Sequence, residues 1–364
     1  MHVVNLPALD GRDPLGFLAA LGLVALLSEE HDACLAFAPQ TMTAALHSSR
    51  LSSPEAIADA LARIIGRTEP DQLIPGVTGF PLPSSGTKDP HRVPRDDVPA
   101  LAAHIQAIGG EPAVSWFLRV VNQFAADAKG HGALTPFMAP RGRQTVRTFF
   151  AGPLKAVMDR PESLLEALIS WQRVPGCTGE NLDHRAAVTA AESPDGLAHS
   201  RGVPGATWLA TQALVLTHLG ADWLPPPIVG SRAQRLREAA EISDVEGDWD
   251  GGRAVPNATM WHRHPNGKVM LWPLWSEPLD LPSVKAIISF GFGRVSNEDV
   301  IVMGETPYGL GEAPETYPPD PAALSIFYAA AARRDRASQY DAGPLSPLNL
   351  PIRQRGKAPL AVPR

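Results

Sequence analysis

The hydrophobic pattern near the start of the chain predicts a helix that has no polar face. From Leu15 to Leu27 no residue is charged or strongly polar. Asp13 suits the N-cap of this helix and Pro14 suits its first turn, where a missing N–H removes no hydrogen bond. A helix of this kind in a soluble protein must be surrounded by other elements. We therefore expect it to form the centre of the core.

The alternative interpretation of this segment is a secretory signal, but the residues that flank it do not fit one. Arg12 is the one Lys or Arg before it and lies between two aspartates, and the segment ends in acidic residues without a small-x-small cleavage pattern. The apolar run is also shorter than the roughly 20 residues that span a membrane. Gly22 in mid-helix costs about 1 kcal/mol relative to Ala, so we expect it at a close contact.

The pattern around this helix predicts an α+β protein. Residues 2–8, 34–37 and 41–46 are predicted strands, and an amphipathic helix follows over 53–66. This β-α-β-β-α order is the opening of a ferredoxin-like unit. We expect residues 1–67 to form that unit.

Four further regions are predicted beyond it: a long loop over 68–98, a helix-rich region over 99–223, an α+β region over 224–342, and a basic, Pro-rich tail over 343–364. We expect the tail to be extended or disordered. The polar stretch over 174–205 is predicted to be irregular. The remaining helices are predicted over 98–108, 113–126, 145–158, 161–171, 205–219, 283–290 and 321–340.

The clearest local signal is a hairpin within 258–274. Ala258–His264 and Lys268–Leu274 are extended in character and flank Asn266-Gly267. Asn-Gly between such segments favours a type I′ turn.

Composition limits the classes of function. The formal charge of −6 and the pI of about 6.0 mean that any nucleic-acid contact must come from a local patch. Cys34 and Cys177 are the two cysteines, too few for a zinc ribbon or a disulfide framework, which fits a reducing cytoplasm. The 37 prolines and 31 glycines indicate many turns and long irregular connections.

The densest group of cations follows a glycine turn and enters a predicted helix. Guanidinium forks and free N–H groups at a helix start suit a phosphate backbone. Phe149 and Phe150 could stack bases, but we expect at least one of them in the core. The alternative is a solvated helix start. The cations are Arg141, Arg143, Arg147 and Lys155.

A second polar group brackets the loop before the helix predicted at 205. Asp183, His184 and Arg185 precede the loop, and Arg201 follows it. An Asp–His pair can orient a general base. Here the two residues are adjacent, so their side chains diverge, and no Ser or Cys nucleophile motif accompanies them. We expect a structural Asp–Arg pair, or a phosphate contact through Arg185 and Arg201.

Metal chemistry has weaker signals. His262 and His264 share one face of a predicted strand, but no third ligand is evident nearby. Asp248 and Asp250 imitate the start of an EF-hand loop, whose twelfth position falls on Asn257 instead of a bidentate Glu. The common phosphate-loop, dinucleotide, zincin and hydrolase motifs are absent from the sequence. We therefore expect no metal and no cofactor.

Two stretches resemble subunits of the subtype I-G (formerly I-U) CRISPR interference modules. In that group a strand leads through an Asn/Asp-Pro turn into a Gly/Leu-rich helix, as NLPALDGRDPLGFLAALGLVALLSE does over residues 5–29. A D-x-R loop there precedes a small-residue helix, as it does here from Asp183 to GVPGATWLATQALVLTHLG over residues 202–220.

The resemblance implies a role in an RNA-guided antiviral complex. The chain would be a small accessory or large-subunit-like component, or the extension associated with the helicase-nuclease. We expect a cytoplasmic, non-catalytic protein that contacts guide RNA or target DNA and other effector subunits, while base pairing reads the sequence. The alternatives are a metal-dependent hydrolase or nuclease using His262, His264, Asp183 and His184, and a scaffold that binds only proteins.

Overall fold

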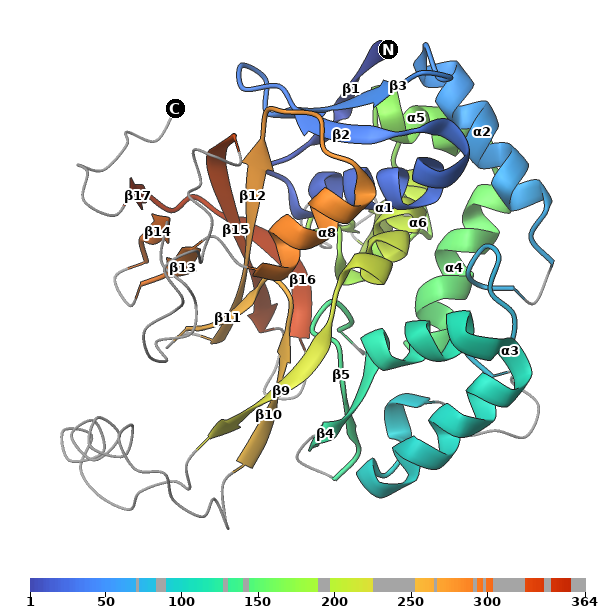
Figure 1. The fold of residues 1–364 in the computed structure, drawn as a ribbon, viewed down its shortest axis with the longest axis vertical. Helices are drawn as coiled ribbons and strands as arrows, with labels where there is room; N and C mark the ends of the chain where they lie inside the picture. Colours follow the sequence, from blue (N-terminus) through green and yellow to red (C-terminus); the bar gives the residue numbers. More distant parts are fainter. Residues whose placement is uncertain are drawn as a thin grey trace.

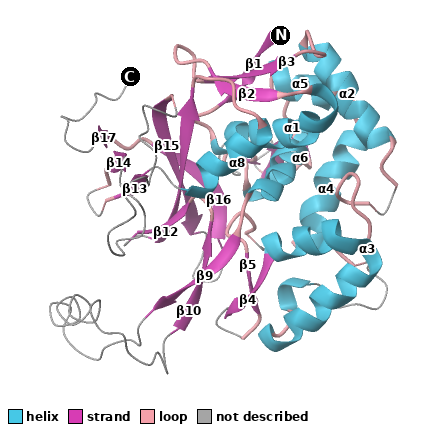
Figure 2. Cartoon of the chain, in the orientation of Figure 1, coloured by secondary structure: helices cyan, strands magenta, loops and turns pink. Residues whose placement is uncertain are grey.

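Helices gather on one side of the molecule and strands on the other (Figure 2). One hydrophobic core runs through the described part of the chain, from Val4 to Ile352. The computed structural model describes residues 1–69, 72–82, 90–126, 130–139, 144–188, 197–224, 253–264, 267–290, 293–296, 299–303, 325–336 and 342–354.

The N-terminal unit has the predicted β-α-β-β-α order, which confirms the α+β assignment. Strand β3 lies between β1 and β2 and is antiparallel to both, the arrangement of a split βαβ unit. The elements are β1 (His2–Asp10), α1 (Pro14–His31), β2 (Cys34–Phe37), β3 (Thr43–Ser48) and α2 (Pro54–Gly66).

Helix α1 is the core helix that its apolar pattern predicts. Asp13 caps it, accepting hydrogen bonds from the backbone N–H groups of Leu15 (2.9 Å) and Gly16 (3.4 Å). By length and composition α1 could cross a membrane, yet 67% of that span is buried inside the protein. Its neighbours include β1, α2 and a second apolar helix, α6 (Pro204–Gln212) (Figure 1).

The contact between α1 and α6 is one of backbone against backbone. A Cβ atom placed on Gly22 would lie 1.8 Å from the carbonyl oxygen of Leu209 in α6. In the same way, a Cβ on Gly205 of α6 would lie 2.1 Å from the carbonyl oxygen of Ser163, the first residue of α5 (Ser163–Ile169). The close contact expected at Gly22 is therefore confirmed, and glycines let three helices stack.

The middle of the chain first departs from its predicted helices between residues 98 and 126. The helices expected at 98–108 and 113–126 form one element, α3 (Val98–Val120), bent at Gly110 where φ is 66°. From Val121 the chain is strand β4 (Val121–Ala126), paired with β5 (Gly132–Leu134), so the helix predicted to residue 126 is wrong beyond 120. Two β-branched valines and a strand partner favour the extended backbone there.

Further along, α4 (Val146–Asp159) and α5 match their predictions. Helix α6 ends earlier than predicted and continues as the 3₁₀ turn η4 (Ala213–Leu216). The stretch over 174–205, which the sequence predicts to be irregular, holds short paired strands. Its elements are β6 (Val174–Pro175), the 3₁₀ turn η3 (Gly179–Asn181), β7 (Ala187–Val188) and β8 (His199–Gly202). Two further 3₁₀ turns, η1 (Pro90–Arg92) and η2 (Arg95–Asp97), precede α3.

The predicted hairpin is confirmed. Strand β11 (Trp261–His264) pairs antiparallel with β12 (Gly267–Trp275), and His264 stands opposite Gly267. The other elements of this part are β9 (Leu219–Leu224), β10 (Arg253–Ala258), α8 (Leu281–Phe290), β13 (Gly293–Val295) and β14 (Ile301–Met303).

The helix predicted over 321–340 is wrong. Residues Ile326–Arg336 form strand β15, paired with β12 on one side and with β16 (Ala342–Leu348) on the other. Alanine has the highest helix propensity, but four successive alanines, 329 to 332, are buried between two strand partners. Tertiary pairing therefore overrides local preference.

The chain after residue 342 is also more ordered than predicted. Strand β16 completes the four-stranded sheet β11-β12-β15-β16, and β17 (Ile352–Gln354) pairs in parallel with β14. These two strands place residues up to 354 in the body of the fold. Residues 355–364 of the expected tail lie outside the described residues.

An aromatic cluster joins the N-terminal unit to the C-terminal sheet. Phe17 of α1 contacts Phe37, Trp272 and Trp275 with ring centroids 5.5–6.3 Å apart. The indole Nε1 of Trp272 donates to the carbonyl oxygen of Gly11 at 2.7 Å. This bond fixes the turn that leads into α1 against β12.

We predict that Gly22→Ala destabilises the protein, although Ala is the better helix former. The added Cβ would force the backbones of α1 and α6 apart, and overpacking of this kind costs about 1–3 kcal/mol. Thermal unfolding should show a lowered Tm. Gly66→Ala at the end of α2 is the control, because nothing lies within 4 Å of its added Cβ. An unchanged Tm for Gly22→Ala would contradict the close contact.

Candidate functional site

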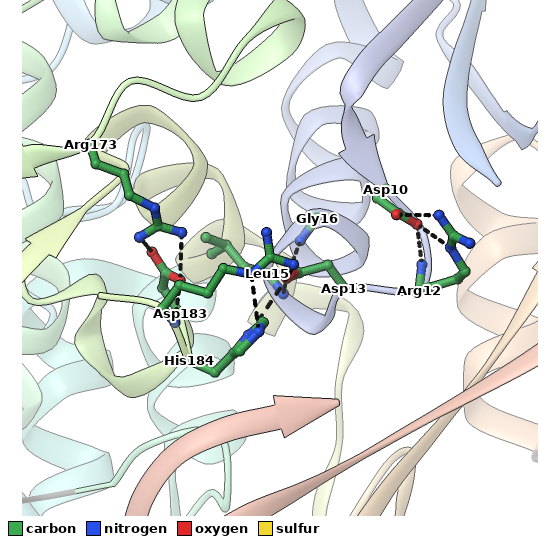
Figure 3. Close-up of polar contacts among 9 residues, drawn as sticks. Asp10, Arg12, Asp13, Leu15, Gly16, Arg173, Asp183 and His184 are labelled. Carbon is green, nitrogen blue, oxygen red and sulfur yellow. Dashed lines mark hydrogen bonds and ion pairs between the residues drawn. The ribbon is translucent and has the colours of Figure 1, made fainter. Parts of the chain in front are cut away.

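The two segments that carry the family resemblance meet at the start of α1. The guanidinium Nη2 of Arg185 lies 3.3 Å from Oδ2 of Asp13, across 172 positions of sequence. The imidazole Nδ1 of His184 lies 3.8 Å from the same oxygen (Figure 3). Asp13 therefore caps α1 with one carboxylate oxygen and faces the D-x-R loop with the other.

Asp183 is held in a second pair directly beside the first. Arg173 donates to both carboxylate oxygens, at 2.8 and 3.2 Å, and the backbone N–H of Arg185 donates to Oδ1 at 2.9 Å. The side chain of Asp183 is only 1% exposed. Asp183 is thus held in a structural Asp–Arg pair, but its partner is Arg173 and not one of the arginines that the sequence singles out, and the contact leaves Asp183 in a positioning role.

Burial is the main influence on the protonation of the His184 and Asp13 side chains. The pKa of His184 is lowered, mainly by burial, and Arg185 Nε donates to its Nε2 at 3.1 Å, which requires a neutral ring. Burial raises the pKa of Asp13, while the His184 and Arg185 charges oppose that shift. As predicted, the side chains of Asp183 and His184 diverge to different partners (Figure 3).

A pocket of about 490 Å³ adjoins this cluster, between the start of α4, η3 and β8. Its size is in the range of small-molecule sites. Most of its described lining residues carry a hydroxyl, amide or carboxyl group. They include Gln144, Thr148, Thr178, Glu180, Asp183 and Ser200.

Glu180 is a second carboxyl group that lines this pocket, and its side chain is partly buried. Thr178 Oγ1 donates to it at 2.9 Å, and Gln144 Nε2 donates to its other oxygen. Burial raises its pKa, and both hydrogen bonds oppose that shift. Glu180 and Asn181 have φ of 49° and 60°, left-handed values that cost free energy in non-glycine residues and cluster at functional sites. Gln144 Oε1 is buried without a hydrogen-bond partner.

Arg334 of β15 supports the pocket from the core. Its side chain is partly buried, and its guanidinium group donates to backbone carbonyl oxygens of Pro136 (2.9 Å), Asn181 (2.6 Å), Phe137 and Gly343 (3.1 Å). Burial lowers its pKa to about 9. One side chain thus ties the Glu180–Asn181 turn to the C-terminal sheet.

The predicted cations on α4 are dispersed in different environments. Arg147 Nη1 lies 3.5 Å from the carbonyl oxygen of Leu82, and Lys155 pairs with Asp159 at 2.6 Å. Both Phe149 and Phe150 are buried core residues, so neither is placed to stack a base. Arg141 and Arg143 lie outside the described residues.

The cations of the second group lie close together. The backbone N–H of Arg201 donates to the carbonyl oxygen of Ala186, next to Arg185, at 2.7 Å. The carbonyl oxygen of Arg201 accepts from Arg173 at 2.9 Å, and the Arg201 side chain is exposed. Arg185 is 59% exposed despite its pair with Asp13. This group surrounds Asp183 at one edge of the pocket.

The alternative metal ligands are not gathered in the part of the chain that the structure describes. No group of three or more His, Cys, Asp or Glu residues there is placed to hold a metal ion. His262 is partly buried, and this burial lowers its pKa to about 4. The side chain of His264 and the EF-hand-like segment around Asp248 lie outside the described residues.

Sequence reasoning missed Arg173, Glu180 and Arg334. Each acts through contacts with residues distant in the chain, and none belongs to a motif. The glycine before Glu180 marks a turn, but a turn signal does not reveal a buried carboxyl group. No known protein family matches the chain, and no curated protein matches it either.

We predict that Asp183→Asn destabilises the protein by about 2–3 kcal/mol, because it breaks a charged, bidentate hydrogen bond in a nearly buried site. Urea unfolding should show a lower midpoint. Asp159→Asn is the matched control, since its pair with Lys155 is exposed on both sides and should contribute less than about 1 kcal/mol. Equal losses for the two variants would contradict the structural role of Asp183.

We also predict a pH dependence from Glu180. Because burial raises its pKa in the folded state, folded protein binds this proton more tightly than unfolded protein. Its contribution to stability is full below the ordinary Glu pKa and is lost as pH rises through the raised value. Glu180→Gln removes this loss, so the Tm of the variant minus that of wild type should increase from about pH 4 upward. A difference independent of pH would contradict the burial effect.

Proposed function

We propose that the protein is a non-catalytic subunit of an RNA-guided antiviral effector complex of the subtype I-G kind. It would work in the cytoplasm, with other effector subunits and guide RNA or target DNA as partners. In such a complex, base pairing reads the sequence while protein subunits bind the backbone and one another.

One observation carries this proposal. The two segments that resemble the family lie far apart in the sequence, yet they pack directly on each other through α1 and α6 and through the Arg185–Asp13 pair. Two chance matches have no reason to be in contact. Two parts of one inherited structural unit are expected to be.

The surface position of the D-x-R loop suits a protein that binds partners in a complex. Asp13 and Asp183 hold the D-x-R loop in place, while the side chains of Arg185 and Arg201 remain accessible at the surface. Fixed arginines at an edge can bind a phosphate backbone or an acidic face of a partner. We assign the same role to Arg141, Arg143, Arg147 and Lys155, the other cations that the sequence singles out.

Co-purification tests this proposal. The tagged chain is co-expressed with the subtype I-G effector subunits and a guide RNA, and the complex is separated by size-exclusion chromatography. We expect the chain to elute with the complex in a fixed ratio. Omitting the guide RNA, and separately each subunit, identifies its partner. Elution of the chain alone in every combination would overturn the proposal.

A further inference from the structure

The polar pocket beside the D-x-R loop is enclosed by segments that are distant in the sequence. Its described lining comes from the start of α4, from η3 and the residues around it, from β8, and from Pro344 of β16. The turn η3 packs against α4, β8 and β16, so these walls share one support. With a volume of about 490 Å³, the cavity can hold a small organic molecule.

The walls are held in place by contacts within the protein. A capping box between Thr145 and Thr148 fixes the start of α4. The guanidinium group of Arg334 donates to the carbonyl oxygen of Asn181 at 2.6 Å, and Arg173 holds Asp183. A ligand therefore enters a formed cavity, and little of its binding free energy is lost in ordering the site.

Glu180 lies against the face of α4 that borders the cavity. Gln144 Nε2 donates to its Oε2, and a Cβ atom placed on Gly152, about two turns further along α4, would lie 3.3 Å from its Oε1. Thr178 Oγ1 donates to Oε1 at 2.9 Å. Each oxygen thus accepts one hydrogen bond from the described residues, whereas a carboxylate oxygen can accept two. The carboxylate has acceptor capacity left for a ligand in the pocket.

The charge of Glu180 is not balanced by the described lining of the pocket. The charge of Asp183 is offset by Arg173 at 2.8 Å. By contrast, the two donors to Glu180 are neutral, and the described lining residues include no cationic side chain. Burial raises the pKa of Glu180, the direction expected of a carboxylate that lacks a cationic partner. A cation would supply that partner, whereas an anion would be repelled.

We propose that this pocket binds a small organic cation whose ammonium or guanidinium group donates hydrogen bonds to Glu180. The hydroxyl and amide oxygens of the lining can accept the remaining N–H bonds of such a group. A metal ion is a poorer occupant, because no three ligating groups are gathered among the described residues. The pocket belongs to this chain alone, so the proposal is independent of membership in an effector complex.

The first experiment is isothermal titration calorimetry of the intact protein with agmatine, which carries both a guanidinium and an ammonium group. Butylurea, a neutral molecule of similar shape, is the comparison ligand. We expect one agmatine to bind per chain, and butylurea to bind at least about tenfold more weakly, because its hydrogen bonds to the carboxylate lack the charge. Absence of agmatine binding at millimolar concentration, or equal affinity for the two compounds, would overturn the proposal.

The second experiment repeats the titration with Glu180→Gln, which preserves the size of the side chain and removes its charge. Affinity for agmatine should fall by about 10- to 100-fold, the effect of losing hydrogen bonds to a charged group. Glu55→Gln at the exposed start of α2 is the matched control, because it changes the net charge equally outside the pocket. An equal loss in both variants would mean general attraction to an acidic protein and would refute the site.

A third variant tests the location without altering Glu180. Ala187 of β7 is exposed and lines the pocket, so Ala187→Leu narrows the cavity. We expect agmatine binding to be lost while the Tm stays unchanged, which separates blockage of the pocket from unfolding. Binding of agmatine to this variant with wild-type affinity would place the ligand elsewhere and overturn the proposal.

Discussion

The fold depends on the contact between α1 and α6, where two backbones meet without side chains between them. Gly22 faces the carbonyl oxygen of Leu209, and Gly205 of α6 makes a similar approach to the carbonyl oxygen of Ser163 in α5. Such distances permit little adjustment, because protein interiors are close-packed. The start of α1 is therefore held in one position relative to the loop before α6. Asp13 and the D-x-R loop meet because of that constraint.

Buried charge is balanced locally around this contact. Asp13 faces Arg185, and Asp183 is gripped by Arg173. Arg334 has carbonyl oxygens in place of a carboxylate, and these come from three separate segments of the chain. Removing the partner of one of these groups would lower the free energy of unfolding by more than the intact pair contributes to it, because a buried charge would be left unpaired. The polar contacts thus select one arrangement of the loops, while the apolar core supplies most of the stability.

The local sequence pattern predicts much of this fold. Where it fails, contacts between segments distant in the sequence decide the structure. The buried helix, its Asp13 cap, the β-α-β-β-α opening and the 258–274 hairpin all follow from periodicity, capping and turn residues. The helix predicted over 321–340 fails because strand pairing on both sides outweighs the propensity of its alanines. Within the candidate site, Asp183 and Arg185 are visible in the sequence. Glu180 is not, because its burial depends on packing between α4 and η3, which no local signal encodes.

The distribution of charge shows why counting cations is a weak guide to binding. The predicted cations whose side chains the structure describes include Lys155 and Arg185, and both lie within reach of carboxylates. Arg119, which belongs to no dense cluster in the sequence, has a half-buried side chain whose pKa is lowered by burial alone, and its Nε has no hydrogen-bond partner. A cation already paired must break that contact to bind an anion, whereas an unpaired and partly desolvated one gains from it. An acidic protein can therefore hold strong anion sites wherever its fold keeps carboxylates away from a few basic groups.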